Sequence, residues 1–207
     1  EWFDYGSYAY YAVIISAVLF SADDPDTADL IGTFAVFAIS FVMRPIGALF
    51  WGSMGDKKGR KWTLSVSIFL MSGATFLIGC LPTYAAIGIG APLLLLLLRM
   101  VQGFSAAGEY AGAATFLAEY APTKKRGLYC SLVPASTAVG LLAASALAFA
   151  TTTLLSQEAV LSWGWRVPFL LAGPLGFIAH YIRTKLEDSP TYQAMQEVVS
   201  GEEGDTP

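Results

Sequence analysis

The segment that decides the fold is the charged run Gly52-Ser53-Met54-Gly55-Asp56-Lys57-Lys58-Gly59-Arg60-Lys61, which lies between two long apolar segments. Its second half concentrates one acidic and four basic side chains, from Asp56 to Lys61. Charges at this density require water, whereas the flanking segments avoid it. The run is therefore expected to form a tight hairpin at a membrane surface, where the chain turns back into the bilayer.

The composition of the 207-residue chain is that of a membrane protein. Hydrophobic residues make up 55% of the sequence and charged residues only 14%, whereas a typical globular domain has roughly 25% charged residues. Apolar runs of about 20 residues, the length that spans a bilayer as a helix, occur repeatedly. These runs are too long and too continuous for the strands of a membrane barrel. The sequence therefore predicts an all-α polytopic membrane protein.

Six apolar segments are long enough to cross the bilayer as helices. We expect these helices at residues 2–20, 28–54, 61–81, 91–119, 128–155 and 165–183. Residues 1–186 would then form one six-helix transmembrane unit. Residues 187–207 are polar and hold several Gly, Pro and acidic residues, so they are expected to form a cytosolic linker with no core of its own.

Lys and Arg gather in alternate loops, and this asymmetry predicts the orientation of the chain. Short loops rich in Lys and Arg remain in the cytosol, and here they follow the second, fourth and sixth segments. Their basic residues are Lys57, Lys58, Arg60, Lys61, Lys124, Lys125, Arg126, Arg183 and Lys185. Both chain ends are therefore expected in the cytosol, with the protein in the plasma (inner) membrane. These clusters are short and flank the membrane, so nucleic-acid binding is not expected.

Ionisable side chains within the predicted helices are candidate functional residues, because a charge at membrane depth is costly. Asp4 lies in the first segment, Arg44 in the second, and Arg99 and Glu109 in the fourth. Gln102 joins Arg99 and Glu109 on one face of the fourth helix, within an arc of about 80°. Such a polar stripe must face protein or a wet cavity. The alternative interpretation is that these charges form structural ion pairs within the bundle.

Two further features of the first and second segments bear on the candidate site. Tyr8 lies one helical turn after Asp4, so a carboxyl and a hydroxyl group could line one path. Pro45 follows Arg44 and is expected to break the second helix there. Glu1, at the start of the first segment, is expected to be an interfacial residue.

Neither an enzyme active site nor a metal site is indicated. The sequence contains one histidine and two cysteines, with no cluster at metal-ligand spacing. No nucleophile with a clustered base and no phosphate-binding loop is present. We therefore expect no enzymatic activity, no metal and no organic cofactor.

Several motifs resemble those of the major facilitator superfamily of transporters. The pattern Gly52…Asp56-Lys57…Gly59-Arg60-Lys61 is similar to the signature of its loop between helices two and three. Arg99-Met100-Val101-Gln102-Gly103 resembles its R-x-x-Q-G element in helix four. Four segments resemble the metabolite:proton symporters, which carry proline and betaine, α-ketoglutarate, shikimate or citrate. They are Glu1-Trp2-Phe3-Asp4, Arg44-Pro45-Ile46-Gly47, Ala107-Gly108-Glu109-Tyr110 and Gly164-Trp165-Arg166-Val167-Pro168-Phe169.

The resemblance, which runs through the whole chain, implies the N-terminal six-helix half of a twelve-helix fold. The substrate site would lie between the two halves, and the second half would come from the same polypeptide or from another copy. The implied activity is symport of a small carboxylate or a zwitterionic metabolite or osmolyte, with the proton as the coupling ion. The helix-five antiporter motif G-x-x-x-G-P is replaced by Val133-Pro134-Ala135-Ser136-Thr137-Ala138, which is consistent with symport.

Candidate roles follow for two sets of residues. The substrate and proton pathway would comprise Asp4, Tyr8, Arg44, Arg99, Gln102 and Glu109. A conformational latch at the cytosolic hairpin would comprise Gly52, Asp56, Lys57, Gly59, Arg60 and Lys61, with Glu119 as a local partner of Arg60. Three alternatives stay open: a non-transporting membrane scaffold or partner subunit, a half-size transporter working as a homodimer, and a hairpin that serves topology alone.

Overall fold

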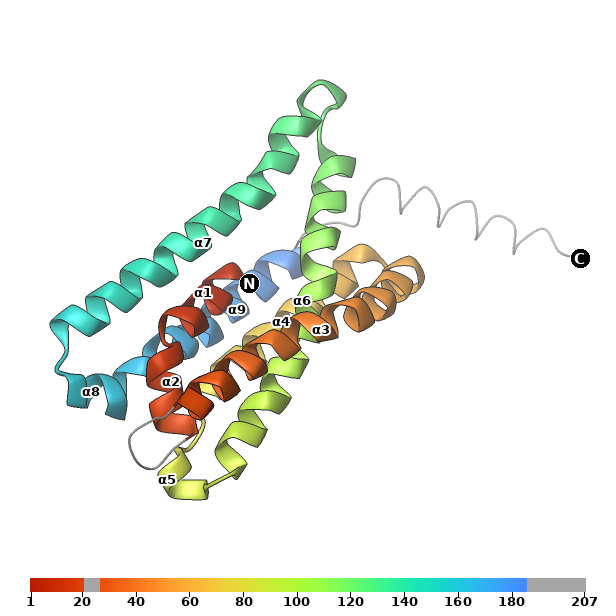
Figure 1. The fold of residues 1–207 in the computed structure, drawn as a ribbon. Helices are drawn as coiled ribbons and strands as arrows, with labels where there is room; N and C mark the ends of the chain where they lie inside the picture. The colour runs from red at the N-terminus through yellow and green to blue at the C-terminus, as the bar shows by residue number, and fades with distance from the viewer. Residues whose placement is uncertain (21–26, 186–207) are drawn as a thin grey trace, which may run out of the picture.

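The computed structural model describes residues 1–20 and 27–185, apart from the side chains of Arg60, Ala111 and Thr184, and this part is built from helices (Figure 1). The helices are α1 (Trp2–Tyr10), α2 (Ala12–Leu19), α3 (Thr27–Lys58), α4 (Arg60–Gly79), α5 (Tyr84–Ile87), α6 (Gly90–Tyr120), α7 (Arg126–Leu154), α8 (Gln157–Ser162) and α9 (Val167–Lys185). Two 3₁₀ turns, η1 (Thr123–Lys125) and η2 (Gly164–Arg166), precede α7 and α9. The linker predicted at residues 187–207 lies outside the described residues.

Each of the six predicted segments is helical in the structure. α1 and α2 together form the first segment, and α3, α4, α6, α7 and α9 form the other five. Within the described residues, four stretches are long and apolar enough to cross a membrane: Thr27–Lys58, Lys61–Gly79, Gly90–Tyr120 and Thr123–Leu154. The short helices α5 and α8 lie in the connections between segments three and four and between segments five and six.

The first segment is divided at Tyr11, so the prediction of one continuous helix over residues 2–20 is wrong in detail. Tyr11 has φ −96° and ψ 8°, outside the α-helical region. Its backbone N–H nevertheless donates to Ser7 O at 3.0 Å, and Ile15 N–H donates to Tyr11 O at 2.8 Å. The Tyr11 side chain is fully buried and its hydroxyl is hydrogen-bonded to the Thr151 hydroxyl on α7. α1 and α2 therefore form one nearly continuous helical segment with an irregular residue at Tyr11. The Tyr11 side chain contacts α7 at this point.

Pro45 lies inside α3, which continues without interruption from Thr27 to Lys58. The helix break predicted at Arg44 and Pro45 is therefore wrong. A proline in a helix removes one backbone donor and crowds the carbonyl one turn earlier, but the helix can continue where packing supports it. Here α6 packs along α3, and its Phe104 backbone lies against Gly47, two residues after Pro45.

The crossing of α3 and α6 is close enough to require glycine on both helices. A Cβ at Gly47 of α3 would meet the backbone of Phe104, and a Cβ at Gly103 of α6 would meet the backbone of Ser40. Trp51 adds a polar contact beside this crossing, since its Nε1–H donates to Phe104 O at 2.9 Å. The glycines therefore let the two backbones touch, as small residues do in membrane helix pairs.

The charged hairpin is shorter than the sequence indicated. α3 extends to Lys58 and α4 begins at Arg60, so Asp56 lies inside α3 and does not follow it. Gly59 alone separates the two helices, with φ 91° and ψ 151°. Residues with a Cβ rarely adopt positive φ, so the turn depends on glycine.

The motif around Arg166 joins the start of α9 to the end of α4. The Arg166 guanidinium donates from Nη1 to Gly79 O at 2.8 Å and to Leu81 O at 2.5 Å. Basic side chains often bind the last carbonyl groups of a helix in this way. α4 and α9 then pack along each other, which holds the third and sixth segments together.

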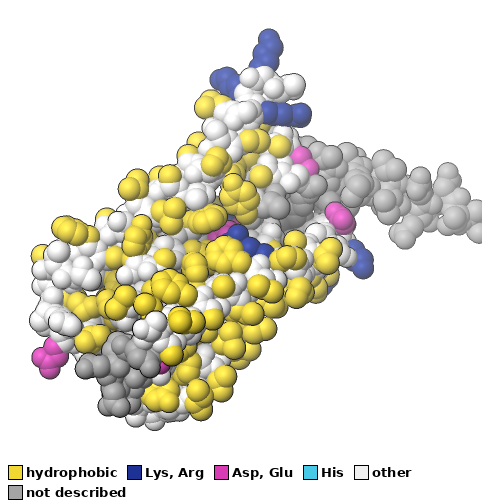
Figure 2. Space-filling model, viewed as in Figure 1, with side chains coloured by type: hydrophobic (Ala, Val, Ile, Leu, Met, Phe, Trp, Pro, Cys, Tyr) yellow, Lys and Arg dark blue, Asp and Glu magenta, His cyan; other side chains and the backbone are white. Residues whose placement is uncertain are grey.

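The outer surface of the bundle exposes many large hydrophobic side chains. Figure 2 shows hydrophobic side chains spread over the long helices, while Lys and Arg side chains gather at the tip where α6 turns into α7. Large hydrophobic side chains are exposed on α3, α7 and α9, among them Leu49, Phe149 and Phe177. A helical surface of this kind is suited to lipid.

Candidate functional site

A chain of hydrogen bonds from α1, α4 and α6 runs through the interior of the bundle. Arg99 Nη1 donates to Gln102 Oε1 at 2.6 Å, and Gln102 Nε2 donates to the Thr75 hydroxyl at 2.6 Å. The Thr75 hydroxyl lies 3.0 Å from Asp4 Oδ2, to which it donates. Arg99 and Gln102 are fully buried and Asp4 is 6% exposed. The chain therefore links a buried acidic group to a buried basic group without a direct ion pair.

Thr75 occupies the centre of this chain and was missed by sequence reasoning. Its hydroxyl also lies 2.9 Å from Met71 O, and its single proton can serve only one of the two acceptors. The available signal was the repetition of hydroxyl residues along α4. Five of them are buried: Thr63, Ser65, Ser67, Ser72 and Thr75.

Arg99 is also held by aromatic rings. Its Cζ lies 3.6 Å from the centroid of the Tyr8 ring, within the range of a cation–π contact. The Tyr8 hydroxyl donates to Thr33 O at 2.9 Å, so it does not point along a path from Asp4. The structure thus brings Tyr8 to Arg99, where the sequence had suggested a role beside Asp4.

Arg44 of α3 forms an ion pair with Glu1 at the start of α1, with Nη2 and Oε1 2.5 Å apart. Three rings surround the guanidinium: its Cζ lies 4.9 Å from Tyr5, 4.9 Å from Phe41 and 5.8 Å from Trp2. The Glu1 side chain is only 7% exposed. Arg44, 43 positions away in the sequence, thus covers Glu1, and the expected position of Glu1 at the membrane interface stays a prediction.

Glu109 of α6 pairs with Arg183 of α9, with Oε1 and Nη2 2.6 Å apart. Arg183 Nη1 also donates to Leu64 O of α4 at 2.7 Å, so one side chain ties three helices together. Sequence reasoning treated Arg183 only as a marker of the cytosolic side. Neither Arg44 nor Arg99 forms the direct pair with Glu109 that the sequence left open.

A cavity of about 430 Å³ lies between α1, α6, α7 and α9, and both ion pairs reach its wall. Its lining includes Glu1, Trp2, Glu109, Tyr110, Ser136, Thr137 and Arg183. The volume falls in the range of small-molecule pockets, and a few convergent polar groups on apolar walls are typical of such sites. Of the predicted pathway residues, Glu109 lines this cavity, while Asp4, Arg99 and Gln102 belong to the buried chain.

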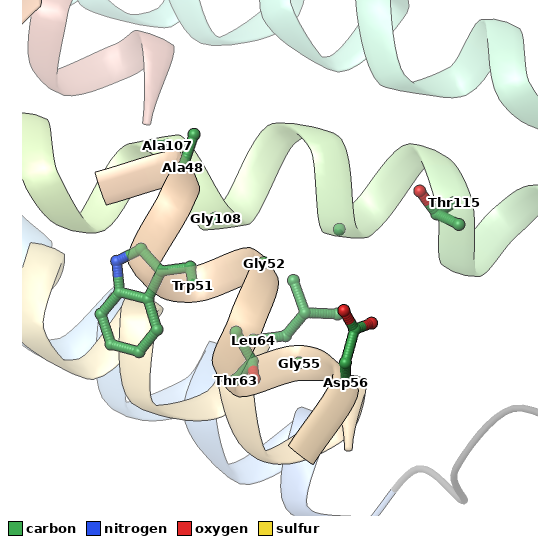
Figure 3. Close-up of a pocket in the computed structure, with 11 residues that line it drawn as sticks. Ala48, Trp51, Gly52, Gly55, Asp56, Thr63, Leu64, Ala107, Gly108 and Thr115 are labelled. Carbon is green, nitrogen blue, oxygen red and sulfur yellow. The ribbon is translucent and has the colours of Figure 1, made fainter. Parts of the chain in front are cut away.

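A second cavity, of about 210 Å³, lies beside the cytosolic hairpin between α3, α4 and α6 (Figure 3). Asp56, Thr63 and Thr115 contribute its polar groups. Figure 3 shows the Asp56 carboxylate directed from α3 toward α6. The walls are otherwise small or apolar and include Trp51, Gly52, Gly55, Leu64 and Gly108. The cavity is partly open to the outside.

Of the residues predicted for the latch, Gly52 and Asp56 line this cavity, whereas Lys57, Gly59, Lys61 and Glu119 are not among its lining residues. Lys57 and Lys58 are exposed on the last turn of α3, and Lys58 Nζ lies 4.5 Å from the Trp62 ring centroid. Glu119 lies in the last turn of α6. The side chain of Arg60 is outside the described part of the structure, so its predicted contact with Glu119 remains a prediction.

Comparison with solved structures defines the fold. The proton:xylose symporter XylE of the major facilitator superfamily, bound to 6-bromo-6-deoxy-D-glucose, superimposes with a TM-score of 0.82 at 14% identity over 94% of this chain and 43% of that chain. A partially occluded, inward-open xylose transporter from Escherichia coli gives a TM-score of 0.80 at 16% identity, covering 94% and 49%. The prediction of one six-helix half of a major facilitator fold is therefore confirmed.

The family follows from sequence comparison. The model of the family described as sugar (and other) transporter matches residues 1–203, so the chain belongs to this family of the major facilitator superfamily. A proline/betaine transporter of Salmonella typhimurium is 44% identical over 205 residues, covering 99% of this chain and 40% of that protein. A putative proline/betaine transporter of Staphylococcus aureus (strain COL) is 47% identical over 194 residues, covering 93% and 41%.

The name of a third relative lists more compounds. The glycine betaine/proline/ectoine/pipecolic acid transporter of Dickeya dadantii is 44% identical over 193 residues, covering 93% of this chain and 38% of that protein. The chain thus spans about two fifths of the length of the curated relatives it matches. These relatives are named transporters and not enzymes, which confirms the prediction that the chain is not an enzyme.

Proposed function

We propose that this chain is one six-helix half of a secondary active transporter that moves a small zwitterionic metabolite or osmolyte together with protons. The observation that carries the proposal is the 430 Å³ cavity, whose wall holds Glu1, Glu109 and Arg183. Acidic and basic groups at one cavity match the two ends of a zwitterion. The names of the relatives, which include proline and betaine, support the same substrate class.

Proton coupling is assigned to the two carboxyl groups that face different surroundings. Glu109 lies at the cavity wall beside Arg183, where it can exchange a proton with water when the cavity opens. Asp4 is buried and bonded by the Thr75 hydroxyl, so a change in its protonation would alter the chain that leads to Arg99. Glu109 is the better placed proton carrier, and Asp4 a group that responds to it.

The partner of this bundle is a second six-helix half, from the same polypeptide or from another copy. Curated relatives are more than twice as long as the matched region, which covers 40% of one of them. Transport in folds built from repeats takes place between the halves. We place the assembled transporter in the plasma membrane, with the basic hairpin and the tip between α6 and α7 on the cytosolic side.

Uptake into liposomes tests the proposal. The complete transporter, assembled with its second half, is reconstituted and given an inward proton gradient, and labelled glycine betaine, proline, α-ketoglutarate, shikimate and citrate are offered in turn. We expect accumulation of glycine betaine or proline that a protonophore abolishes. Uptake of the dicarboxylates alone would contradict the substrate class, and no uptake of any compound would favour the scaffold function.

The same assay on the 207-residue chain alone separates the remaining alternatives. A half-size transporter that works as a homodimer should accumulate substrate without any added half. We expect no accumulation by the chain alone, and recovery when the second half is supplied. Accumulation by the chain alone would show that two copies are sufficient.

A further inference from the structure

The Arg44 guanidinium lies in surroundings like those that bind quaternary ammonium ions. The rings of Trp2, Tyr5 and Phe41, here called the aromatic cage, all have centroids within 6 Å of Arg44 Cζ. Glu1 supplies a carboxylate on the same cation. Aromatic rings around a cation, with an acidic group beside it, form a general device for recognising ammonium groups that cannot donate hydrogen bonds.

Three donors at the aromatic cage are buried and have no hydrogen-bond partner among the described residues. They are the Trp2 indole Nε1–H, the Tyr5 hydroxyl and the Arg44 Nε–H. A buried polar group without a partner is uncommon in a folded protein and calls for an explanation. A carboxylate accepts several such bonds at once, so these donors suit the acidic end of a zwitterion.

The aromatic cage also borders space that a small molecule can occupy. Glu1 and Trp2 both line the 430 Å³ cavity, so a ligand in that cavity meets one ring and the carboxylate directly. The charged pair at the aromatic cage is itself partly accessible, since the Arg44 side chain is 26% exposed and that of Glu1 7%.

Arg44 and Arg99 differ in how firmly their guanidinium groups are held. Both guanidinium groups lie near aromatic rings, and both have nitrogens without a partner. Arg99, however, is fully buried and anchored to Gln102. The Arg44 side chain is 26% exposed and is held to Glu1 by one ion pair, so it has an open side toward which it can move, whereas Arg99 has none.

We propose that the aromatic cage binds the ammonium group of a zwitterionic substrate. In the absence of substrate, the Arg44 guanidinium occupies the aromatic cage. The incoming ammonium group takes the position beside Glu1, and the displaced Arg44 pairs with the substrate carboxylate together with the free donors of Trp2 and Tyr5. This inference rests on the proposed function and names the substrate class of the same site.

Charge balance favours a zwitterion over an anion in this exchange. Glu1 and Arg44 are neutral as a pair, and a zwitterion adds no net charge to a site at membrane depth. A dicarboxylate would bring excess negative charge beside Glu1, which is costly in such surroundings. A quaternary ammonium group is favoured further, because it loses little hydration on entering the aromatic cage.

Replacement of Phe41 tests the aromatic cage with a matched control. Phe41→Leu keeps an apolar side chain of similar size but removes the π face, and Phe34→Leu makes the same change on α3 at an exposed ring outside the aromatic cage. We expect Phe41→Leu to raise the KM for glycine betaine about tenfold with little change in maximal rate. Phe34→Leu should leave the KM unchanged, and Phe41→Trp should restore it.

A charge-free analogue tests the same idea in the unmodified transporter. 3,3-Dimethylbutyrate has the shape of glycine betaine but carries a tert-butyl group in place of the trimethylammonium group. We expect unlabelled glycine betaine to inhibit uptake of the labelled compound, and 3,3-dimethylbutyrate at the same concentration to inhibit far less. Equal inhibition, or equal KM values for Phe41→Leu and Phe34→Leu, would overturn the proposal.

The outcomes distinguish the aromatic cage from the underlying function. If glycine betaine uptake is driven by protons but 3,3-dimethylbutyrate inhibits it as well as glycine betaine does, the proposed transporter function stands and substrate binding by the aromatic cage is ruled out. If the unmodified transporter takes up neither glycine betaine nor proline, both proposals are ruled out. If Phe41→Leu does not reach the membrane, the analogue experiment still decides the matter without any variant.

Discussion

Glu109 and Arg183 lie 74 positions apart in the sequence and form an ion pair at the wall of the larger cavity, with 2.6 Å between Oε1 and Nη2. The Arg183 side chain is 21% exposed and that of Glu109 12%, so the pair is neither at the open surface nor sealed in the core. A carboxylate in this position can lose its partner when α6 and α9 move apart. We therefore expect proton binding at Glu109 to be coupled to movement of α6 relative to α9.

Replacing Glu109 with Gln should abolish proton-driven uptake while the protein still inserts into the membrane. The amide keeps the shape of the side chain but cannot bind and release a proton as a carboxyl group does, and Arg183 loses its counter-charge. Uptake under an imposed proton gradient measures the coupling, and yield of monodisperse protein measures folding. The double variant Glu109→Gln with Arg183→Gln separates the two roles: a purely structural pair predicts recovered uptake, whereas a proton carrier predicts that uptake stays lost.

Replacing Thr75 with Val should interrupt the chain between Asp4 and Gln102. Valine has nearly the same shape, so the loss is confined to the hydroxyl and its bonds. We expect a loss of stability of about 1–3 kcal/mol, the usual effect of leaving buried polar groups unpaired, together with slower transport. Thermal unfolding in detergent and uptake rates measure the two effects. Thr75→Ser keeps the hydroxyl and should behave like the unmodified protein.

Lysine at the two intramembrane arginines should have different effects. Arg44→Lys should raise the KM for substrate, because one ammonium group cannot form the two parallel bonds that guanidinium gives a carboxylate. Arg99→Lys should mainly lower thermal stability, because Arg99 is fully buried and bonded to Gln102. Uptake kinetics and unfolding temperature, measured on both variants, give the comparison. An unchanged KM in both would argue against direct substrate contact by either arginine.

Replacing Asp56 with Asn tests the latch at the cytosolic hairpin. The Asp56 carboxylate faces the open cavity beside α6 (Figure 3), where a helix N-terminus of the second half would be attracted to it. We expect slower transport and greater labelling, from the cytosolic side, of a Ser136→Cys reporter in the larger cavity, in a background without Cys80 and Cys130. Topology depends on Lys and Arg and hardly on acidic residues. Unchanged transport and labelling would therefore leave the hairpin a topological role only.

Replacing Gly47 with Ala should prevent stable folding, whereas the same change at Gly52 should be tolerated. Both glycines lie on α3, but a Cβ at Gly47 would meet the Phe104 backbone, while one at Gly52 has nothing within 4 Å. A backbone clash cannot be relieved by a rotamer change, so the helix crossing itself must shift. Yield and unfolding temperature in detergent measure the difference. Equal stability of the two variants would show that α3 and α6 can separate at little cost.

The sequence by itself determined the class of fold. A bilayer requires helices of about 20 apolar residues with every backbone group satisfied internally, so the apolar runs indicated six segments, of which four are long and apolar enough in the described residues to cross a membrane. The charged hairpin and the R-x-x-Q-G element then indicated the superfamily, and spacing along one helix placed Arg99 and Gln102 on the same face. That local relationship appears in the structure as a hydrogen bond of 2.6 Å.

Only the tertiary structure decided which charged groups meet. The partners in the pairs of Glu1 with Arg44 and Glu109 with Arg183 lie on different helices, 43 and 74 positions apart. Their contact depends on how each helix is rotated about its axis. The sequence of a helix that is apolar on nearly every side gives little information about that rotation. Thr75 was missed for the same reason, since one hydroxyl among many on α4 gains its role only from the helices that pack against it.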